Sequence, residues 1–261
     1  MPHAVKIIYI IYLLIFLPSI SFAEDSAISS IFKKYGVEGA IVISSLDGRI
    51  VYIHNNKRAS VRYHPASTFK IVHTLIALEE GVIESSSDTI KWDGTDKGWK
   101  SWNKDQTLRS AFSLSCIWCY QGFAKKIGSG KYIKYLNDIE YGNKKVGSDV
   151  TTFWLKGDLK ISPIEQIDVL RNIYLEKLPF HEDYFKILKD IMVVDKTSKY
   201  TLRAKTGTYK GAEDKYGWYV GYIEIDNEVW LFSSNIKLQN IGDSQYRKKL
   251  VMDSLKVKGI L

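Results

Sequence analysis

The stretch PASTFKIV, residues 65–72, opens the segment on which the predicted fold depends. Beyond it, apolar residues from Phe69 to Leu78 occupy nearly every face of an expected helix, and Gly81 supplies a C-terminal stop. A helix that is apolar on all sides is buried inside a domain. The sequence therefore predicts a buried helix here, with the rest of the chain arranged around it.

Ser67 and Lys70 lie three positions apart at the start of this helix, so their side chains share one face. A serine hydroxyl is a weak nucleophile until a base removes its proton, and burial lowers the pKa of a lysine enough for it to act as, or become, that base. The same spacing occurs elsewhere in the chain, at residues 30–33, 101–104 and 234–237. Only the copy at 67–70 sets its lysine inside an apolar run, where an uncompensated charge is costly. The pair is predicted to be a nucleophile and its activator.

Residues 1–23 have the composition of a secretory signal. They hold one lysine and no acid, with an apolar run at 7–16 and a small-x-small ending at 21–23. The apolar run is short for a membrane span. We expect cleavage before Glu24, which leaves an exported protein at residues 24–261, periplasmic or secreted and without a membrane anchor.

The formal net charge of the chain is +8, but its basic residues are scattered. Nucleic-acid-binding proteins instead cluster basic and aromatic side chains on one face. The sequence therefore predicts a solvated basic surface and no nucleic-acid partner. It leaves the oligomeric state open.

The pattern of strands and helices predicts an α+β fold. Two β-prone runs at 39–44 and 49–53 flank an Asp-Gly turn, which is typical of a hairpin. Further strands are expected at 201–205, 217–225 and 228–235, and a closing amphipathic helix at 244–256. The sequence between the first two strands and the later three, at about 88–175, has a mostly helical pattern. We expect a central antiparallel sheet flanked by helices, an inserted helical lobe, and a site in the cleft between sheet and lobe.

Four further motifs accompany the Ser67–Lys70 pair. They are SCI at 115–117, YGN at 141–143, FWL at 153–155 and KTGT at 205–208. Lys205 and Thr206 would bring an ammonium and a hydroxyl to the cleft, while Gly207 would let a substrate lie against the backbone. The N–H of Thr208 could join that of Ser67 in holding an oxyanion.

With these motifs the sequence resembles the class D serine β-lactamases, the oxacillinase type. STFK at 67–70, S-x-I at 115–117, YGN at 141–143, Trp154 and KTG at 205–207 stand in the order of that family, and the likeness covers nearly all of residues 24–261. Class A enzymes have Ser-Asp-Asn at the second motif, where this chain has Cys-Ile. The resemblance implies one catalytic domain of the β-lactamase/transpeptidase type, which hydrolyses β-lactams, gives antibiotic resistance and requires no metal.

The apolar second motif bears on the chemistry of Lys70. Nearby apolar side chains would exclude water from the amine and favour its neutral form, which can add carbon dioxide. The resemblance implies that Lys70 is N6-carboxylated, with carbon dioxide or bicarbonate as the sole additional reagent. It further implies that the Trp154 indole N–H holds the carbamate, which serves as base for acylation of Ser67 and for the deacylating water.

The resemblance also implies roles for the remaining motif residues. Ser115 would pass a proton to the departing lactam nitrogen. Lys205 and Thr206 would bind the substrate carboxylate, with Arg247 as its bidentate partner. Ile117 stands where the family has valine and is expected to pack beside Lys70.

Cys116 and Cys119 are the only cysteines. Side chains at i and i+3 of a helix rarely meet disulfide geometry, so we expect two buried thiols in preference to a disulfide. A zinc site would need a second pair of ligands at suitable spacing, which the sequence lacks.

Three other titratable residues are assigned no catalytic role. Glu165 lies in a segment with a helical pattern, and the carbamate already supplies a deacylating base, so Glu165 is not expected to act as one. His64 and His73 flank the first motif and are expected to be satisfied structural histidines.

Two other functions share this chemistry. A D,D-peptidase or transpeptidase would acylate but deacylate slowly, and a β-lactam-sensing receptor domain would stay acylated. The lack of further membrane segments argues against the sensor. The preferred β-lactam depends on loop shapes around Trp102, Trp118 and the segment after Thr208, so the sequence leaves both the substrate range and chloride sensitivity open.

Overall fold

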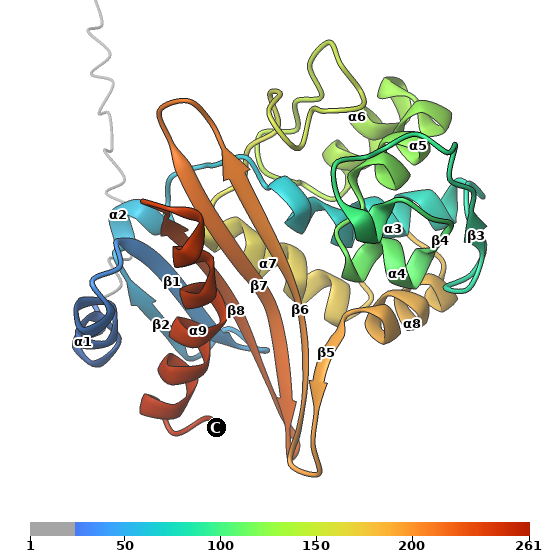
Figure 1. Ribbon diagram of the computed structural model, residues 1–261. Coiled ribbons are helices and arrows are strands. Elements are labelled where there is room, and N and C mark those ends of the chain that lie inside the picture. The colour runs from blue at the N-terminus through green and yellow to red at the C-terminus, as the bar shows by residue number, and fades with distance from the viewer. Residues whose placement is uncertain (1–23) are drawn as a thin grey trace, which may run out of the picture.

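The computed structural model describes residues 24–261, so the signal predicted at 1–23 lies outside the described residues. Its centre is a six-stranded antiparallel sheet in the order β2-β1-β8-β7-β6-β5 (Figure 1). The strands are β1 (Gly39–Ser45), β2 (Val51–His54), β5 (Val193–Lys196), β6 (Tyr200–Lys210), β7 (Lys215–Ile225) and β8 (Glu228–Lys237). The predicted α+β class and antiparallel sheet are confirmed, and β6 extends five residues beyond its expected end at 205.

Helices cover both faces of this sheet. α9 (Tyr246–Val257) lies in front of it and α7 (Pro163–Tyr174) behind it (Figure 1), while α1 (Ser26–Tyr35) packs against α9. Side chains of β1 alternate between the two cores, because Ile41 and Ile43 join the α1/α9 cluster while Ala40 and Val42 join the other. Both faces of β1 are therefore buried, as its mostly apolar sequence requires.

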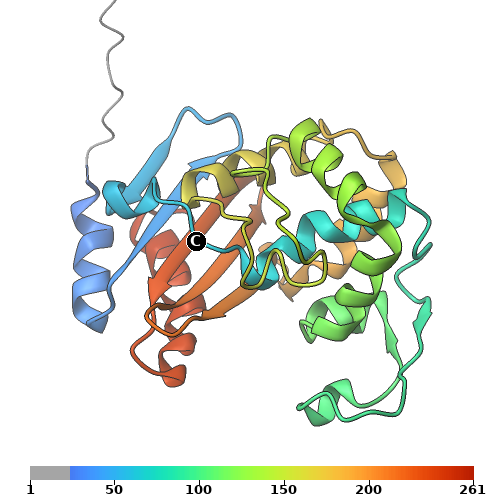
Figure 2. The same cartoon turned by 90° about the horizontal axis from the view of Figure 1, so that it is seen from above.

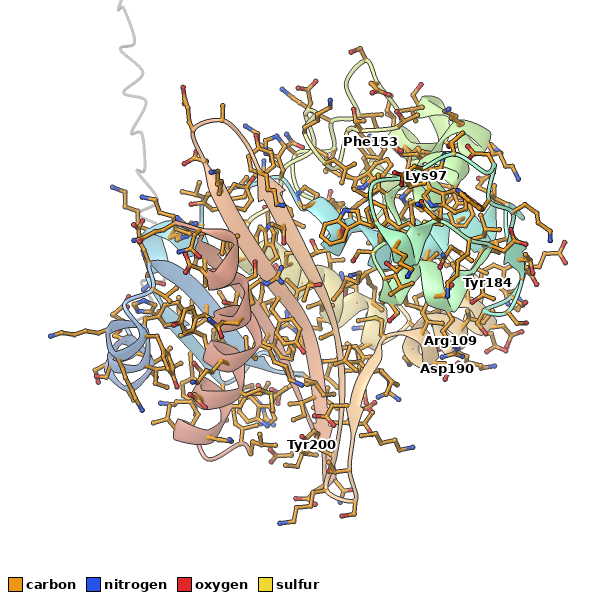
Figure 3. The ribbon with its side chains drawn as sticks, viewed as in Figure 1. Lys97, Arg109, Phe153, Tyr184, Asp190 and Tyr200 are labelled. Carbon is orange, nitrogen blue, oxygen red and sulfur yellow. A yellow bond between two sulfur atoms is a disulfide. The ribbon has the colours of Figure 1, made fainter. Side chains whose placement is uncertain are left out.

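Most of the remaining helices form a lobe beside the sheet, best separated in the view from above (Figure 2). Its elements are η1 (Ala66–Phe69), α3 (Lys70–Glu79), β3 (Thr89–Ile90), η2 (Lys100–Trp102), β4 (Gln106–Thr107), α4 (Leu108–Ser113), α5 (Ile117–Ile127), α6 (Ser129–Asp138) and α8 (Glu182–Ile191). Arg109 on α4 pairs with Asp190 on α8 (Figure 3). α3 and α8 belong to this lobe although they fall outside residues 88–175, whereas α7, inside that range, packs on the sheet.

Two short helices complete the chain, α2 (Asn56–Ala59) after β2 and η3 (Ile241–Gln245) before α9. None of the helices within residues 24–261 has the length and apolar character needed to cross a bilayer.

The predicted buried helix is confirmed. α3 is buried along its whole length to Leu78, and Gly81 beyond it has a left-handed φ of 61°. Its first turn differs from the expectation, because Ser67 lies in the tighter 3-10 turn η1 and α3 begins at Lys70. This places Ser67 and the turn η1 against β6, at the junction of lobe and sheet.

Candidate active site

Ser67 and Lys70 meet at the junction of η1 and α3. Lys70 Nζ lies 3.3 Å from Ser67 Oγ, as the i, i+3 spacing predicted. Just before the serine, Ala66 has a φ of 49°, a conformation that costs a non-glycine residue free energy and is often found at functional sites. The turn is held by Thr68, whose Oγ1 donates to the Pro65 carbonyl at 2.7 Å.

The Lys70 amine is fully shielded from solvent, with 0% of the residue exposed. Burial lowers its pKa well below the ordinary lysine value, and the charge of Lys205 lowers it further. Among residues 24–261 no carboxylate offsets these effects. Nζ lies 4.9 Å from the centre of the Tyr120 ring. A charged amine here would lack a compensating anion, so the site favours a neutral amine or a negatively charged derivative of it.

Trp154 reaches this site from a turn at residues 150–156. It is fully buried, and its Nε1–H has no hydrogen-bond partner among the described residues. Such an unpaired buried donor costs about 1–3 kcal/mol. The main chain is paired, because the Trp154 carbonyl accepts from the Ala66 N–H at 2.9 Å. The segment that carries this unpaired indole donor is therefore bonded directly to the residue before Ser67, and the indole ring packs near Phe69 and His73, which lie on either side of Lys70 in the chain.

His73 lies one turn after Lys70 and was not assigned to the site from sequence. Its ring centre is 5.0 Å from that of Trp154, and its Nε2 pairs with Tyr132 Oη at 2.5 Å. Its Nδ1 has no partner among the described residues, so the expected satisfied histidine is only half satisfied. Burial and then the charge of Lys70 lower its pKa well below the usual value. The i, i+3 relation to Lys70 is the sequence signal that could have found it.

Ser115 joins the site from the connection between α4 and α5. Its φ is 56°, and its Oγ accepts a hydrogen bond from Lys205 Nζ at 2.5 Å. A hydroxyl held by an ammonium group can pass a proton onward to a substrate atom. The lobe and the sheet thus each contribute one group to this contact.

Cys116 and Cys119 form a disulfide, so the expectation of two free thiols is wrong. The reasoning failed because Cys116 is not helical: α5 begins at Ile117, and Cys116 is its N-cap with φ −50° and ψ 109°. The Cα atoms are 5.5 Å apart, within the range that a disulfide spans. Ile117 itself is half-buried at the start of α5.

Strand β6 carries the Lys-Thr-Gly motif to the junction with η1. Burial, followed by the charge of Arg247, lowers the pKa of Lys205 to about 7. Gly207 permits the close approach, because a Cβ there would lie 3.0 Å from the Pro65 carbonyl oxygen and 3.1 Å from the Thr68 methyl group. The glycine therefore lets β6 pack closely against the turn that carries Ser67, while its expected place beside a substrate stays a prediction.

Arg247, at the start of α9, lies over the same strand. Its Nη1 donates to the Gly207 carbonyl at 3.0 Å and to Thr208 Oγ1 at 2.7 Å. Its side chain crosses Gly217 on β7, where a Cβ would lie 2.6 Å from the arginine Cδ. The guanidinium and the Lys205 ammonium thus flank one stretch of β6, where they could bind a carboxylate together.

The YGN motif holds the far end of the Trp154 loop. Asn143 Nδ2 donates to the Asp158 carbonyl at 2.7 Å, and Asn143 Oδ1 accepts from the Lys160 N–H at 3.0 Å. Gly142 has a φ of 52°, and a Cβ there would lie 2.1 Å from the Lys160 carbonyl oxygen. The Asn143 side chain and Gly142 thus hold the main chain of residues 158–160, which is a structural role.

Glu165 has a structural role. It caps the first turn of α7 through Ser162 and pairs with Arg62. No three His, Cys, Asp or Glu side chains within residues 24–261 group closely enough to hold a metal ion.

Comparison with known proteins agrees with this geometry. The family model "Penicillin binding protein transpeptidase domain" matches residues 38–256. The chain is 33% identical to β-lactamase OXA-48 of Klebsiella pneumoniae over 99% of this chain and 98% of the relative, and 34% identical to OXA-2 of Salmonella typhimurium over 97% and 93%. Among solved structures, the class D β-lactamase YbXI from Nostoc superposes with a TM-score of 0.88 at 37% identity, covering 90% of this chain and 99% of that one. FUS-1 (OXA-85) from Fusobacterium nucleatum gives 0.88 at 32% identity, covering 92% and 100%. Motifs, fold and relatives agree, and the chain belongs to the class D serine β-lactamases.

Proposed function

We propose that this protein hydrolyses β-lactam antibiotics through an acyl-enzyme on Ser67, with Lys70 carboxylated on its Nζ, and thereby gives resistance to them. One observation carries the proposal: an uncompensated, fully buried amine lies 3.3 Å from the nucleophile, while a buried indole N–H has no partner among the described residues. A carboxyl group on Lys70 suits this donor set, since it removes the buried cation and gives Trp154 an acceptor.

In the proposed acylation, Ser67 Oγ attacks the lactam carbonyl carbon and loses its proton. The C–N bond of the ring breaks, and the departing nitrogen takes a proton from Ser115, which recovers one from the Lys205 ammonium that donates to it. Before deacylation, the base releases the proton of Ser67 to solvent and Lys205 takes one up from solvent. A carboxylated Lys70 would supply an oxyanion basic enough to take a proton from Ser67 and, later, from water. In deacylation a water attacks the ester carbon, the C–O bond to Ser67 breaks, and Ser67 regains its proton.

Substrate binding is proposed at β6. Arg247 and the protonated form of Lys205 offer positive charge along the strand, and most β-lactams carry a carboxylate beside the lactam nitrogen, whose binding would favour that protonated form. The N–H groups of Ser67 and Thr208 are the proposed donors to the carbonyl oxygen as it gains charge. We further propose export to the periplasm, on the basis of the signal pattern at residues 1–23.

The decisive experiment follows hydrolysis of a chromogenic cephalosporin by residues 24–261. The proposal expects sustained turnover that falls in degassed, bicarbonate-free buffer and returns when bicarbonate is added. Lys70→Ala should abolish turnover, whereas Lys33→Ala, which alters the solvent-exposed lysine of another Ser-x-x-Lys sequence, should not. A single stoichiometric burst without turnover would instead indicate the peptidase or the sensor. Full activity of Lys70→Ala would exclude lysine as the source of the base.

A further inference from the structure

His64, two residues before Ala66, joins three separate parts of the fold. Its Nε2 lies 2.9 Å from the Gly157 carbonyl oxygen, in the segment that carries Trp154. Its Nδ1 lies 3.0 Å from Tyr216 Oη on β7. Its ring stacks on Tyr209 of β6, with ring centres 4.4 Å apart and planes inclined by 5°. The half-buried imidazole therefore bridges the sheet and the Trp154 turn.

The hydrogen bonds define one tautomer. Tyr216 Oη already accepts from the His64 backbone N–H at 2.8 Å, which leaves its own hydrogen for the imidazole Nδ1. The Gly157 carbonyl can only accept, so Nε2 carries the ring hydrogen. Burial lowers the pKa of His64, and the nearby Lys160 adds to this while the Gly157 contact and Asp158 oppose it. A neutral imidazole satisfies every partner.

The imidazole is anchored on the sheet side. The His64 carbonyl accepts from Trp218 Nε1 at 2.9 Å, and its N–H donates to Tyr216, so both main-chain groups of His64 are tied to β7. The position of the His64 main chain is thus set by the sheet, and its imidazole extends from there to the Trp154 turn.

The Trp154 turn is compact enough to transmit this contact. The Thr152 carbonyl accepts from the N–H groups of Leu155, Lys156 and Gly157. At Gly157 a Cβ would lie 2.6 Å from Phe153 Cα, so the two ends of the turn are in contact. A displacement of the Gly157 carbonyl would therefore also move Trp154.

Two parallel links connect the nucleophile segment to this turn, and they start two residues apart. One is the main-chain bond from Ala66 N–H to the Trp154 carbonyl, and the other is the side-chain bond from His64 to the Gly157 carbonyl. We propose that His64 is a positioning residue, which fixes the Trp154 indole N–H relative to Lys70 by holding Gly157 at a set distance from β7. This inference rests on the proposed carboxylation of Lys70.

Three substitutions at His64 separate the contacts. In His64→Gln the amide nitrogen reaches the place of Nε2 and keeps the donor to Gly157. In His64→Asn the shorter amide reaches only the place of Nδ1, where its oxygen can accept from Tyr216 Oη, and the Gly157 link is lost. His64→Phe keeps the stacking on Tyr209 and loses both hydrogen bonds.

The measurement is the bicarbonate concentration that gives half-maximal hydrolysis of a chromogenic cephalosporin, together with the carbamate signal in ¹³C NMR after addition of labelled bicarbonate. We expect His64→Asn and His64→Phe to need about three- to tenfold more bicarbonate, the effect of one lost neutral hydrogen bond. His64→Gln should stay within about twofold of the unmodified protein. At saturating bicarbonate, kcat should return to the unmodified value in all three variants.

Several outcomes would overturn the role of His64. These are an unchanged bicarbonate requirement in His64→Asn and His64→Phe, an equal shift in His64→Gln, or a loss of kcat that saturating bicarbonate does not restore. The last would indicate general damage to the fold, which thermal unfolding of the same variants would also detect. Failure of the underlying mechanism is distinguishable, because the unmodified protein would then show neither bicarbonate dependence nor a carbamate signal.

Discussion

Replacing Trp154 by phenylalanine tests the central feature of the site. The substitution keeps an aromatic ring between Phe69, His73 and Phe153, and it removes the indole N–H that has no partner among the described residues. Its effect should differ between the carboxylated and the free protein, because the donor has an acceptor in only one of them.

The free-energy changes expected for Trp154→Phe follow from the burial of the indole. In the free protein, removing an unpaired buried donor relieves about 1–3 kcal/mol. The smaller ring loses roughly 1–2 kcal/mol of packing. The free energy of unfolding without bicarbonate should therefore change by between a loss of about 1 kcal/mol and a gain of about 2 kcal/mol. A hydrogen bond to a charged acceptor contributes about 1.5–3 kcal/mol, so the affinity for carbon dioxide should fall about 10- to 150-fold.

Two assays read these effects separately: hydrolysis rate against bicarbonate concentration at constant pH, and unfolding with and without bicarbonate. The unmodified protein should gain stability from bicarbonate, because only the folded state binds it, and Trp154→Phe should gain less. Trp230→Phe is the matched control, since it removes a buried indole that is paired with Glu228, on the strand β8. An unaltered bicarbonate requirement in Trp154→Phe, or a loss above about 2 kcal/mol in bicarbonate-free buffer, would refute the reasoning.

Three further outcomes are expected. Burial holds the pKa of the Lys70 amine well below its usual value, so the amine is neutral above that lowered pKa. As the pH falls through it, the amine becomes protonated and cannot take up carbon dioxide. Hydrolytic activity at constant dissolved carbon dioxide should therefore fall on the acid side, and a flat pH–rate profile there would contradict this. Changing both Cys116 and Cys119 to serine should lower the free energy of unfolding by roughly 2 kcal/mol, as a short closed loop implies; urea denaturation measures this, and equal stability would show that the disulfide does not stabilise the fold. Arg247→Ala should raise KM for carboxylate-bearing substrates about 10- to 100-fold with little change in kcat; the same loss for a substrate ester would exclude a carboxylate contact.

The core of the site follows from short-range sequence patterns. The spacing of Ser67 and Lys70 puts them on one helical face, and the apolar run to Leu78 buries the lysine, because both effects depend on residues within a few turns of each other. The Asp-Gly turn predicts the β1–β2 hairpin in the same way, although β2 begins at Val51 and not at residue 49.

The disulfide shows where local reasoning fails. A Cys-x-x-Cys spacing within a predicted helix argues against a disulfide, yet the left-handed backbone at Ser115 precedes an α5 that begins only at Ile117. Cys116 therefore has a non-helical backbone, which lets its side chain bond to that of Cys119. A non-glycine residue takes up such a φ only when its surroundings compensate for the strain. Here the surroundings include Lys205 on β6, which is 90 residues away in the chain.

Residue types and spacings alone were enough to place Ser67 beside Lys70 and to predict the antiparallel sheet, since each depends on neighbours along the chain. The pairing of His64 with Gly157, the unpaired indole of Trp154 and the contact of Arg247 with β6 came only from the folded chain. These features bring together segments that are tens of residues apart in the chain, and their geometry is set by how the lobe packs against the sheet. No local propensity encodes that packing, because it arises from burial summed over the whole domain.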